Sequence, residues 1–192
     1  MSIPLRLIAC LGLAATLSSC PETTVETDFG LQAAELKTSD WNGLYHVAGD
    51  DDVFKVEVSD AALGQLTLTE LPAAAKKEKD KPLLLTLRRA SLDKDDDDIY
   101  FATLVEKHDA PQRRPLYLVR ANNSGQILLW TINPQSIEAG IKAGTLKGTL
   151  KIPDKDGAHC HLDSDPANYA QLVQPLYWNW QEPAMLIRQK TR

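Results

Sequence analysis

The feature of this chain that most restricts its fold is a succession of short segments in which apolar and polar residues alternate. Val53–Val58 and Gln65–Leu71 show this pattern most clearly. Because successive side chains of a strand point to opposite faces of a sheet, the alternation predicts strands with one buried face. Further strands are predicted at Leu83–Leu87, Ile99–Val105, Leu116–Val119, Ile127–Ile132 and Leu146–Ile152, and less clearly at Ala158–Leu162 and Met185–Ile187.

Two other segments carry the start and stop signals of helices. Asn133 and Asp165 are suitable N-caps, and each is followed by proline, which is favoured in the first helical turn. The first segment ends at Gly144 and the second at Pro175, so helices are predicted near 134–143 and 165–174. The predicted fold is therefore α+β and predominantly antiparallel β, arranged as a sheet or a barrel.

The N-terminus has a different composition. Arg6 precedes the apolar run Leu7–Leu17, whose eleven residues are too few to span a hydrocarbon core of about 30 Å. A positive start, a short apolar run and small residues before a cut are typical of a secretory signal. With Leu17-Ser18-Ser19-Cys20 at its end, this segment resembles the lipobox of bacterial lipoprotein precursors.

The resemblance implies a specific processing route. Diacylglycerol is transferred to the Cys20 thiol, residues 1–19 are removed as a signal peptide, and the new terminus is N-acylated. Two or more acyl chains anchor a protein stably, so lipid on Cys20 would hold the protein at the membrane. In this family Asp after the acceptor is associated with inner-membrane retention, so Pro21 favours the outer membrane, with the protein facing the periplasm.

The processed chain has 173 residues, enough for one domain with a substantial core. Removing Arg6 from the 21 Lys and Arg leaves 20 against 26 Asp and Glu, a net charge of −6, which argues against nucleic-acid binding. The polar opening after Cys20 predicts a flexible tether over residues 20–40, followed by a single β-rich domain over residues 41–192. Cys160 is left as the one free thiol, with no disulfide partner.

One cluster has residue types suited to a metal. On a strand, His159 and His161 would share one face while Cys160 points to the other. Two imidazoles bind a divalent metal when a third ligand joins them, for example His46, His108 or a nearby aspartate. An ordinary strand with two half-exposed histidines explains the same pattern.

Two further patterns suggest binding. In an extended segment Trp178 and Trp180 would line one face, which suits a sugar or a protein partner, although packing against the last helix is the favoured interpretation. The acidic run Asp93–Asp98 lacks the glycine of a calcium loop, so a solvated turn is the favoured interpretation.

Gly43-Leu44-Tyr45, at the start of the strand series, resembles the opening of a lipocalin, with tyrosine in place of the family's tryptophan. That resemblance implies an eight-stranded barrel that carries one apolar ligand. The chain lacks the common motifs of hydrolases, zinc proteases and nucleotide-binding enzymes, which favours a non-enzymatic role without a cofactor. Three hypotheses follow: an envelope factor that binds another envelope protein or a cell-wall component for assembly or inhibition, a lipocalin-like carrier, and a metal-binding protein or metalloenzyme using His159 and His161.

Overall fold

The computed structural model describes residues 23–26, 29–71, 82–91, 99–105, 114–122, 125–151 and 159–189. Its strands are β1 (Thr23–Val25), β2 (Gly43–Val47), β3 (Val53–Asp60), β4 (Gln65–Leu71), β5 (Leu83–Arg89), β6 (Ile99–Val105), β7 (Arg114–Ala121), β8 (Gln126–Thr131), β9 (Gly148–Lys151), β10 (His159–Leu162) and β11 (Ala184–Arg188). Its helices are α2 (Thr38–Trp41), α3 (Pro134–Lys142) and α4 (Pro166–Leu172), with a 3₁₀ turn η2 at Pro175–Tyr177.

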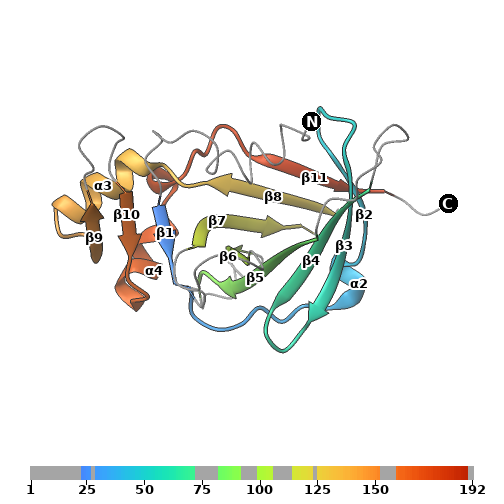
Figure 1. Cartoon of the computed structure of the whole chain (residues 1–192), viewed down its shortest axis with the longest axis horizontal. Coiled ribbons are helices and arrows are strands. Elements are labelled where there is room, and N and C mark those ends of the chain that lie inside the picture. Colours follow the sequence, from blue (N-terminus) through green and yellow to red (C-terminus); the bar gives the residue numbers. More distant parts are fainter. Residues whose placement is uncertain are drawn as a thin grey trace.

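Eight of these strands form a closed antiparallel barrel. Each strand from β2 to β8 pairs with the next one along the chain, and β11 closes the circuit by pairing with both β8 and β2. Connections of only four or five residues join β2 to β3, β3 to β4 and β7 to β8, which suits antiparallel neighbours because these need only a turn between them. The predicted α+β fold with a barrel-like antiparallel sheet is confirmed, and the strands predicted from alternation all form (Figure 1).

The two predicted helices form where their caps place them. The Asn133 side chain accepts a hydrogen bond from Ser136 N at 3.1 Å, and Asp165 accepts one from Ala167 N at 2.8 Å. Each cap satisfies a backbone N–H that has no partner inside the helix. Among the described residues, no helix combines the length and apolar character needed to cross a bilayer.

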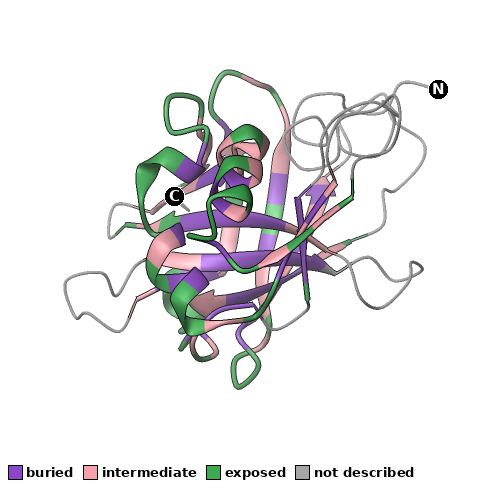
Figure 2. Cartoon of the chain, turned by 90° about the vertical axis from the view of Figure 1, so that its left-hand side faces the viewer, coloured by how far each residue is buried: buried purple, intermediate pink, exposed green. Residues whose placement is uncertain are grey.

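The described core consists of two apolar clusters. One fills the barrel and is built from inward-facing residues such as Leu66, Leu68 and Leu85. The other lies between the outer face of β6–β8 and an annex formed by β1, β9, β10, α3 and α4 at one end of the barrel (Figure 1). Viewed from the annex, buried strands run behind helices whose outer faces are exposed (Figure 2).

The N-terminal segment differs from the expected tether over its described part. β1 pairs in parallel with β10 and antiparallel with β7, and Val25 and Phe29 are fully buried. Farther along, Leu31 N donates to Arg89 O at 3.1 Å and Ala34 N donates to Leu87 O at 3.0 Å. A strand of three residues is too short to show alternation, and the strands that pair with it lie far away in sequence. The polar composition around β1 therefore predicts a tether although the segment is a strand.

Arg188 secures α2 at the other end of the barrel. Its Nη1 donates to Ser39 O at 2.9 Å, and its Nη2 donates to Asn42 O. Gly43 makes room for this side chain, because a Cβ there would lie 2.8 Å from the Arg188 Nε. Tyr45, buried beside it, donates its hydroxyl to Trp41 O at 3.0 Å. Burial raises the pKa of Tyr45, with the charge of Arg188 acting in the opposite direction, so the phenol stays a donor.

Candidate functional site

The interior of the barrel is filled almost completely. The pocket that the described residues line inside the barrel has a volume of about 10 Å³, and its lining is apolar and includes Trp41, Leu68 and Leu129. A single water needs about 10–15 Å³, whereas a pocket for a small molecule has roughly 300–1,000 Å³. Chemistry or recognition at the surface therefore fits this geometry better than binding within the barrel.

The structure places Trp178 and Trp180 in different environments. Trp178 is 3% exposed, and its Nε1 donates to Leu172 O at 2.6 Å, so it belongs to the annex core. Trp180 is 44% exposed and stacks on Trp130, with ring centroids 4.5 Å apart and an angle of 7° between the rings. The chain turns here, because Glu182 N donates to Asn179 O, and the extended geometry that would give both tryptophans one face ends at this turn.

Trp180 is one of three large apolar side chains exposed in the connection from α4 to β11. Val173 is 36% exposed, Leu176 is 54% exposed, and all three lie within eight residues of each other. We call Val173, Leu176 and Trp180 the exposed apolar segment. Single exposed leucines are common on protein surfaces, whereas large apolar residues that form one patch indicate a contact site, and these three are close in sequence.

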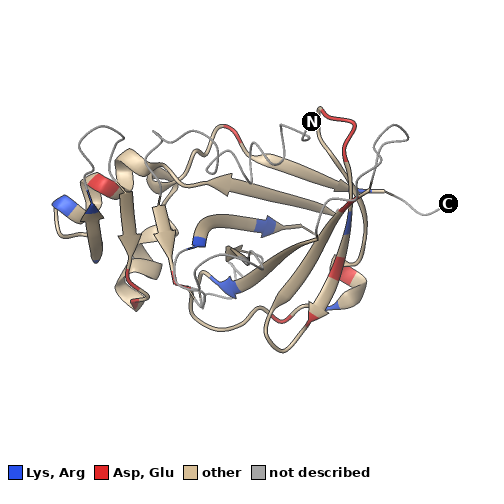
Figure 3. Ribbon diagram, viewed as in Figure 1, with Lys and Arg blue, Asp and Glu red and all other residues tan. Residues whose placement is uncertain are grey.

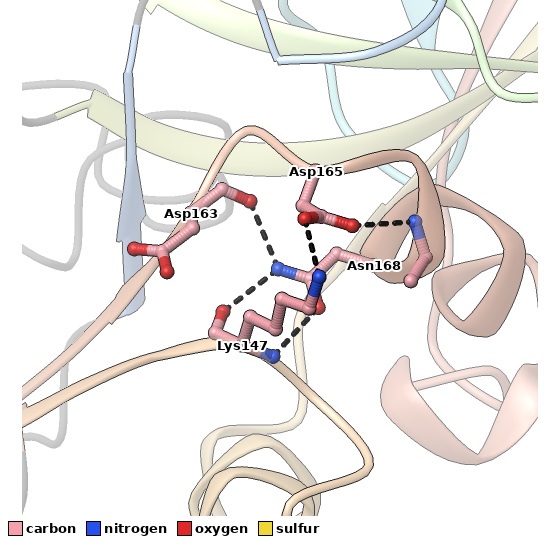
Figure 4. Close-up of polar contacts among 5 residues, drawn as sticks. Lys147, Asp163, Asp165 and Asn168 are labelled. Atoms are coloured by element: carbon pink, nitrogen blue, oxygen red, sulfur yellow. Dashed lines mark hydrogen bonds and ion pairs between the residues drawn. The ribbon is translucent and has the colours of Figure 1, made fainter.

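A buried asparagine holds α4, the helix that leads into this segment. Asn168 is fully buried, and its amide nitrogen donates to Lys147 O at 2.7 Å and to Asp163 O at 2.8 Å. Its side-chain oxygen accepts from Lys147 N at 2.8 Å, and the Lys147 ammonium lies 2.7 Å from Asp165 (Figure 4). The ion pair with Lys147 and the hydrogen bond from Ala167 hold the pKa of Asp165 below its usual value.

Sequence reasoning did not identify Asn168 as a structural centre. The available signal was its position four residues before Leu172, which places a polar residue on the core side of the helix. A buried amide must find partners for both its donors and its acceptor, and the backbone around Lys147 supplies them.

The histidine strand has the predicted alternation. His159 and His161 are half-buried on one face of β10, and Cys160 is 2% exposed on the other. The His161 Nδ1 lies 3.2 Å from the Thr24 hydroxyl. Within the described part of the chain, no group of three or more His, Cys, Asp or Glu side chains is arranged to hold a metal. His46 lies on β2, whereas His108 and Asp93–Asp98 are outside the described residues.

Burial determines the chemistry of the Cys160 thiol. Its pKa is raised mainly by removal from water and further by the negative charge of Glu138, while an interaction with the Thr23 side chain and the positive charge of Lys142 act in the opposite direction. A buried thiol with a raised pKa is a poor nucleophile, because the thiolate is the reactive form. Cys160 therefore behaves as a core residue.

The lipidation candidate Cys20 lies outside the described residues, three positions before β1. Comparison with known proteins finds no matching family model, no matching curated protein and no matching solved structure.

Proposed function

We propose that this chain is a bacterial lipoprotein, anchored through Cys20 in the outer membrane and facing the periplasm, that acts as a non-enzymatic binding, assembly or inhibitory factor. The lipobox-like segment supports the anchor. Every described element begins after Cys20, so cleavage before this residue leaves all of them in the mature protein.

The packed barrel is the observation that supports a binding role. With a space of only about 10 Å³ inside it, the barrel offers partners its outer surface. The exposed apolar segment provides side chains of the kind that proteins and membranes contact.

The anchor is tested by the Cys20→Ala variant in a Gram-negative host. The wild-type protein is expected to fractionate with the outer membrane, to incorporate labelled palmitate and to gain the mass of the lipid at Cys20. The variant is expected to lose all three properties. A wild-type protein that carries no lipid would contradict the anchor.

The binding role is tested by photo-cross-linking in intact cells. Photoreactive residues are placed at Leu63, which is 55% exposed in the turn after β3, and at Lys55 on the outer face of β3. A discrete cross-linked protein that disappears in the Cys20→Ala background is the expected result. The same pattern of diffuse products with and without Cys20 would argue against a specific partner.

The apolar lining of the barrel supports a second candidate, a carrier of an apolar ligand related in architecture to the lipocalin-like alternative. A ligand would require the interior to expand, since pockets of this kind are at least about thirty times larger than the present space. Native mass spectrometry of protein purified from membranes provides the test. A retained apolar compound would favour the carrier, and ligand-free protein that fails to take up a fluorescent fatty acid would eliminate it.

A further inference from the structure

The point at which the chain enters the folded body is fixed by β1. Thr23 and Thr24 are buried, and β1 pairs with two other strands. Cys20 precedes Thr23 by three residues, and three residues of fully extended chain span at most about 10 Å. A lipid on Cys20 thus keeps the surface around Thr23 within about 10 Å of the membrane.

The exposed apolar segment is linked to this entry point through β7 and β8. Strand β7 pairs with β1 at Pro115, opposite Thr24, and with β8 at Tyr117, opposite Thr131. The Thr131 carbonyl in turn accepts a hydrogen bond from Asn179 N at 2.9 Å. The path from β1 to the residue before Trp180 therefore crosses from β1 to β7, from β7 to β8 and from β8 to Asn179, three steps with a two-residue offset along β7.

The chemistry of the segment suits the membrane interface. Tryptophan is enriched at the boundary between headgroups and acyl chains, where its apolar ring and its polar N–H are both accommodated. The Trp130 ring holds Trp180 in place by stacking, and the Trp130 Nε1 donates to Trp180 O at 3.2 Å. The connection carries the exposed acid Glu182 (Figure 3), so its contact with lipid would be apolar rather than a basic patch.

We propose that Val173, Leu176 and Trp180 insert into the interfacial layer of the bilayer that holds the lipid of Cys20, and so fix the orientation of the barrel on the membrane. The inference rests on the proposed anchoring at Cys20. The turn that contains Leu63, which joins β3 to β4, then faces away from the bilayer, where an envelope partner can reach it.

The test uses tryptophan emission from the full-length gene product purified from bacterial membranes. The protein is reconstituted in phosphatidylcholine vesicles, with or without bromine atoms on the acyl chains just below the headgroups. Bromine quenches a tryptophan only at close range, and Trp41, Trp130 and Trp178 are each buried. The wild-type protein is expected to be quenched, and Trp180→Phe is expected to reduce that quenching, with the remainder coming from Trp130, which stacks on residue 180 at 4.5 Å.

A matched pair of variants tests the inference without altering the tryptophan stack. Leu176 and Leu63 are 54% and 55% exposed, and each is replaced by tryptophan in the otherwise unchanged chain. Leu176→Trp is expected to add quenching by brominated lipid, whereas Leu63→Trp is expected to add none. Circular dichroism checks that each variant is folded.

The mass of the purified protein separates the two proposals. Lipidated protein whose tryptophans are not quenched, or in which Leu176→Trp behaves like Leu63→Trp, would overturn the orientation while leaving the anchor intact. That outcome would assign the exposed apolar segment to a protein partner. Protein without lipid on Cys20 would overturn the anchor and the inference together.

Discussion

Asn168 connects three parts of the annex through one side chain. It contacts the backbone of Lys147 and Asp163, and it does so from within α4. A buried group whose hydrogen bonds are all formed contributes modestly to stability. Removing that group is more costly, because its buried partners then have no hydrogen bond to protein or to water.

Replacing Asn168 with alanine is expected to lower the free energy of unfolding by at least about 2 kcal/mol, because the buried backbone groups of Lys147 lose their partners. The control is Asn179→Ala, since Asn179 is exposed and bonds Thr131 and Ile132 where water can replace it. Urea denaturation measures both. Equal losses in the two variants would show that burial of Asn168 is unimportant.

Cys160 is expected to make stability depend on alkaline pH. Its folded pKa lies above the ordinary value of 9.0, so the unfolded chain releases the thiol proton first as the pH rises. The stabilisation is complete below the unfolded pKa and is lost as the pH rises through the folded one. Above pH 9 the free energy of unfolding should therefore fall more steeply in the wild type than in Cys160→Ala. Tyr45, whose pKa is also raised, contributes equally to both proteins. Parallel pH profiles would contradict this role for the thiol.

At the scale of the element, the N-terminal segment is part of the fold rather than a spacer. The Phe29 ring lies 4.9 Å from that of Tyr169 and 5.5 Å from that of Phe101, measured between centroids. Phe29→Ala is expected to cost about 3–5 kcal/mol, the range for a buried phenylalanine. The exposed neighbour Gln32, replaced by alanine, should change stability by less than about 0.5 kcal/mol. Chemical denaturation distinguishes the two results, and a silent Phe29→Ala would restore the tether interpretation.

The sequence predicts those elements whose signals are local. Alternation locates β4, and the caps Asn133 and Asp165 locate the two longer helices. The pairing of β11 with β2 depends on residues about 140 positions apart, as in the contact of Arg188 with Tyr45, and no local pattern encodes it. The shared face that an extended segment would give Trp178 and Trp180 does not form for a similar reason, because one turn at residues 179–182 separates the two side chains.

At the scale of the whole molecule, the two cores share the same barrel strands. Leu118 belongs to the annex core and Val119 to the barrel core, although they are neighbours on β7. Unfolding one core would expose strands that support the other, so a single cooperative transition is expected. Tryptophan fluorescence and far-ultraviolet circular dichroism should give the same denaturation midpoint. Separate midpoints would show that the annex and the barrel unfold independently.

The annex covers only part of the barrel wall, so the burial of the outward-facing residues differs from strand to strand. In β4 every second residue is buried, whereas in β7 four consecutive residues, Leu116 to Val119, are buried. A survey of all single substitutions should therefore find that every second position along β4 tolerates substitution. It should find no tolerant position among Leu116 to Val119 of β7. On the uncovered side of the barrel, outward-facing residues can change without disturbing a core. On the covered side, each residue packs into either the barrel core or the annex core, so a change in either direction affects packing.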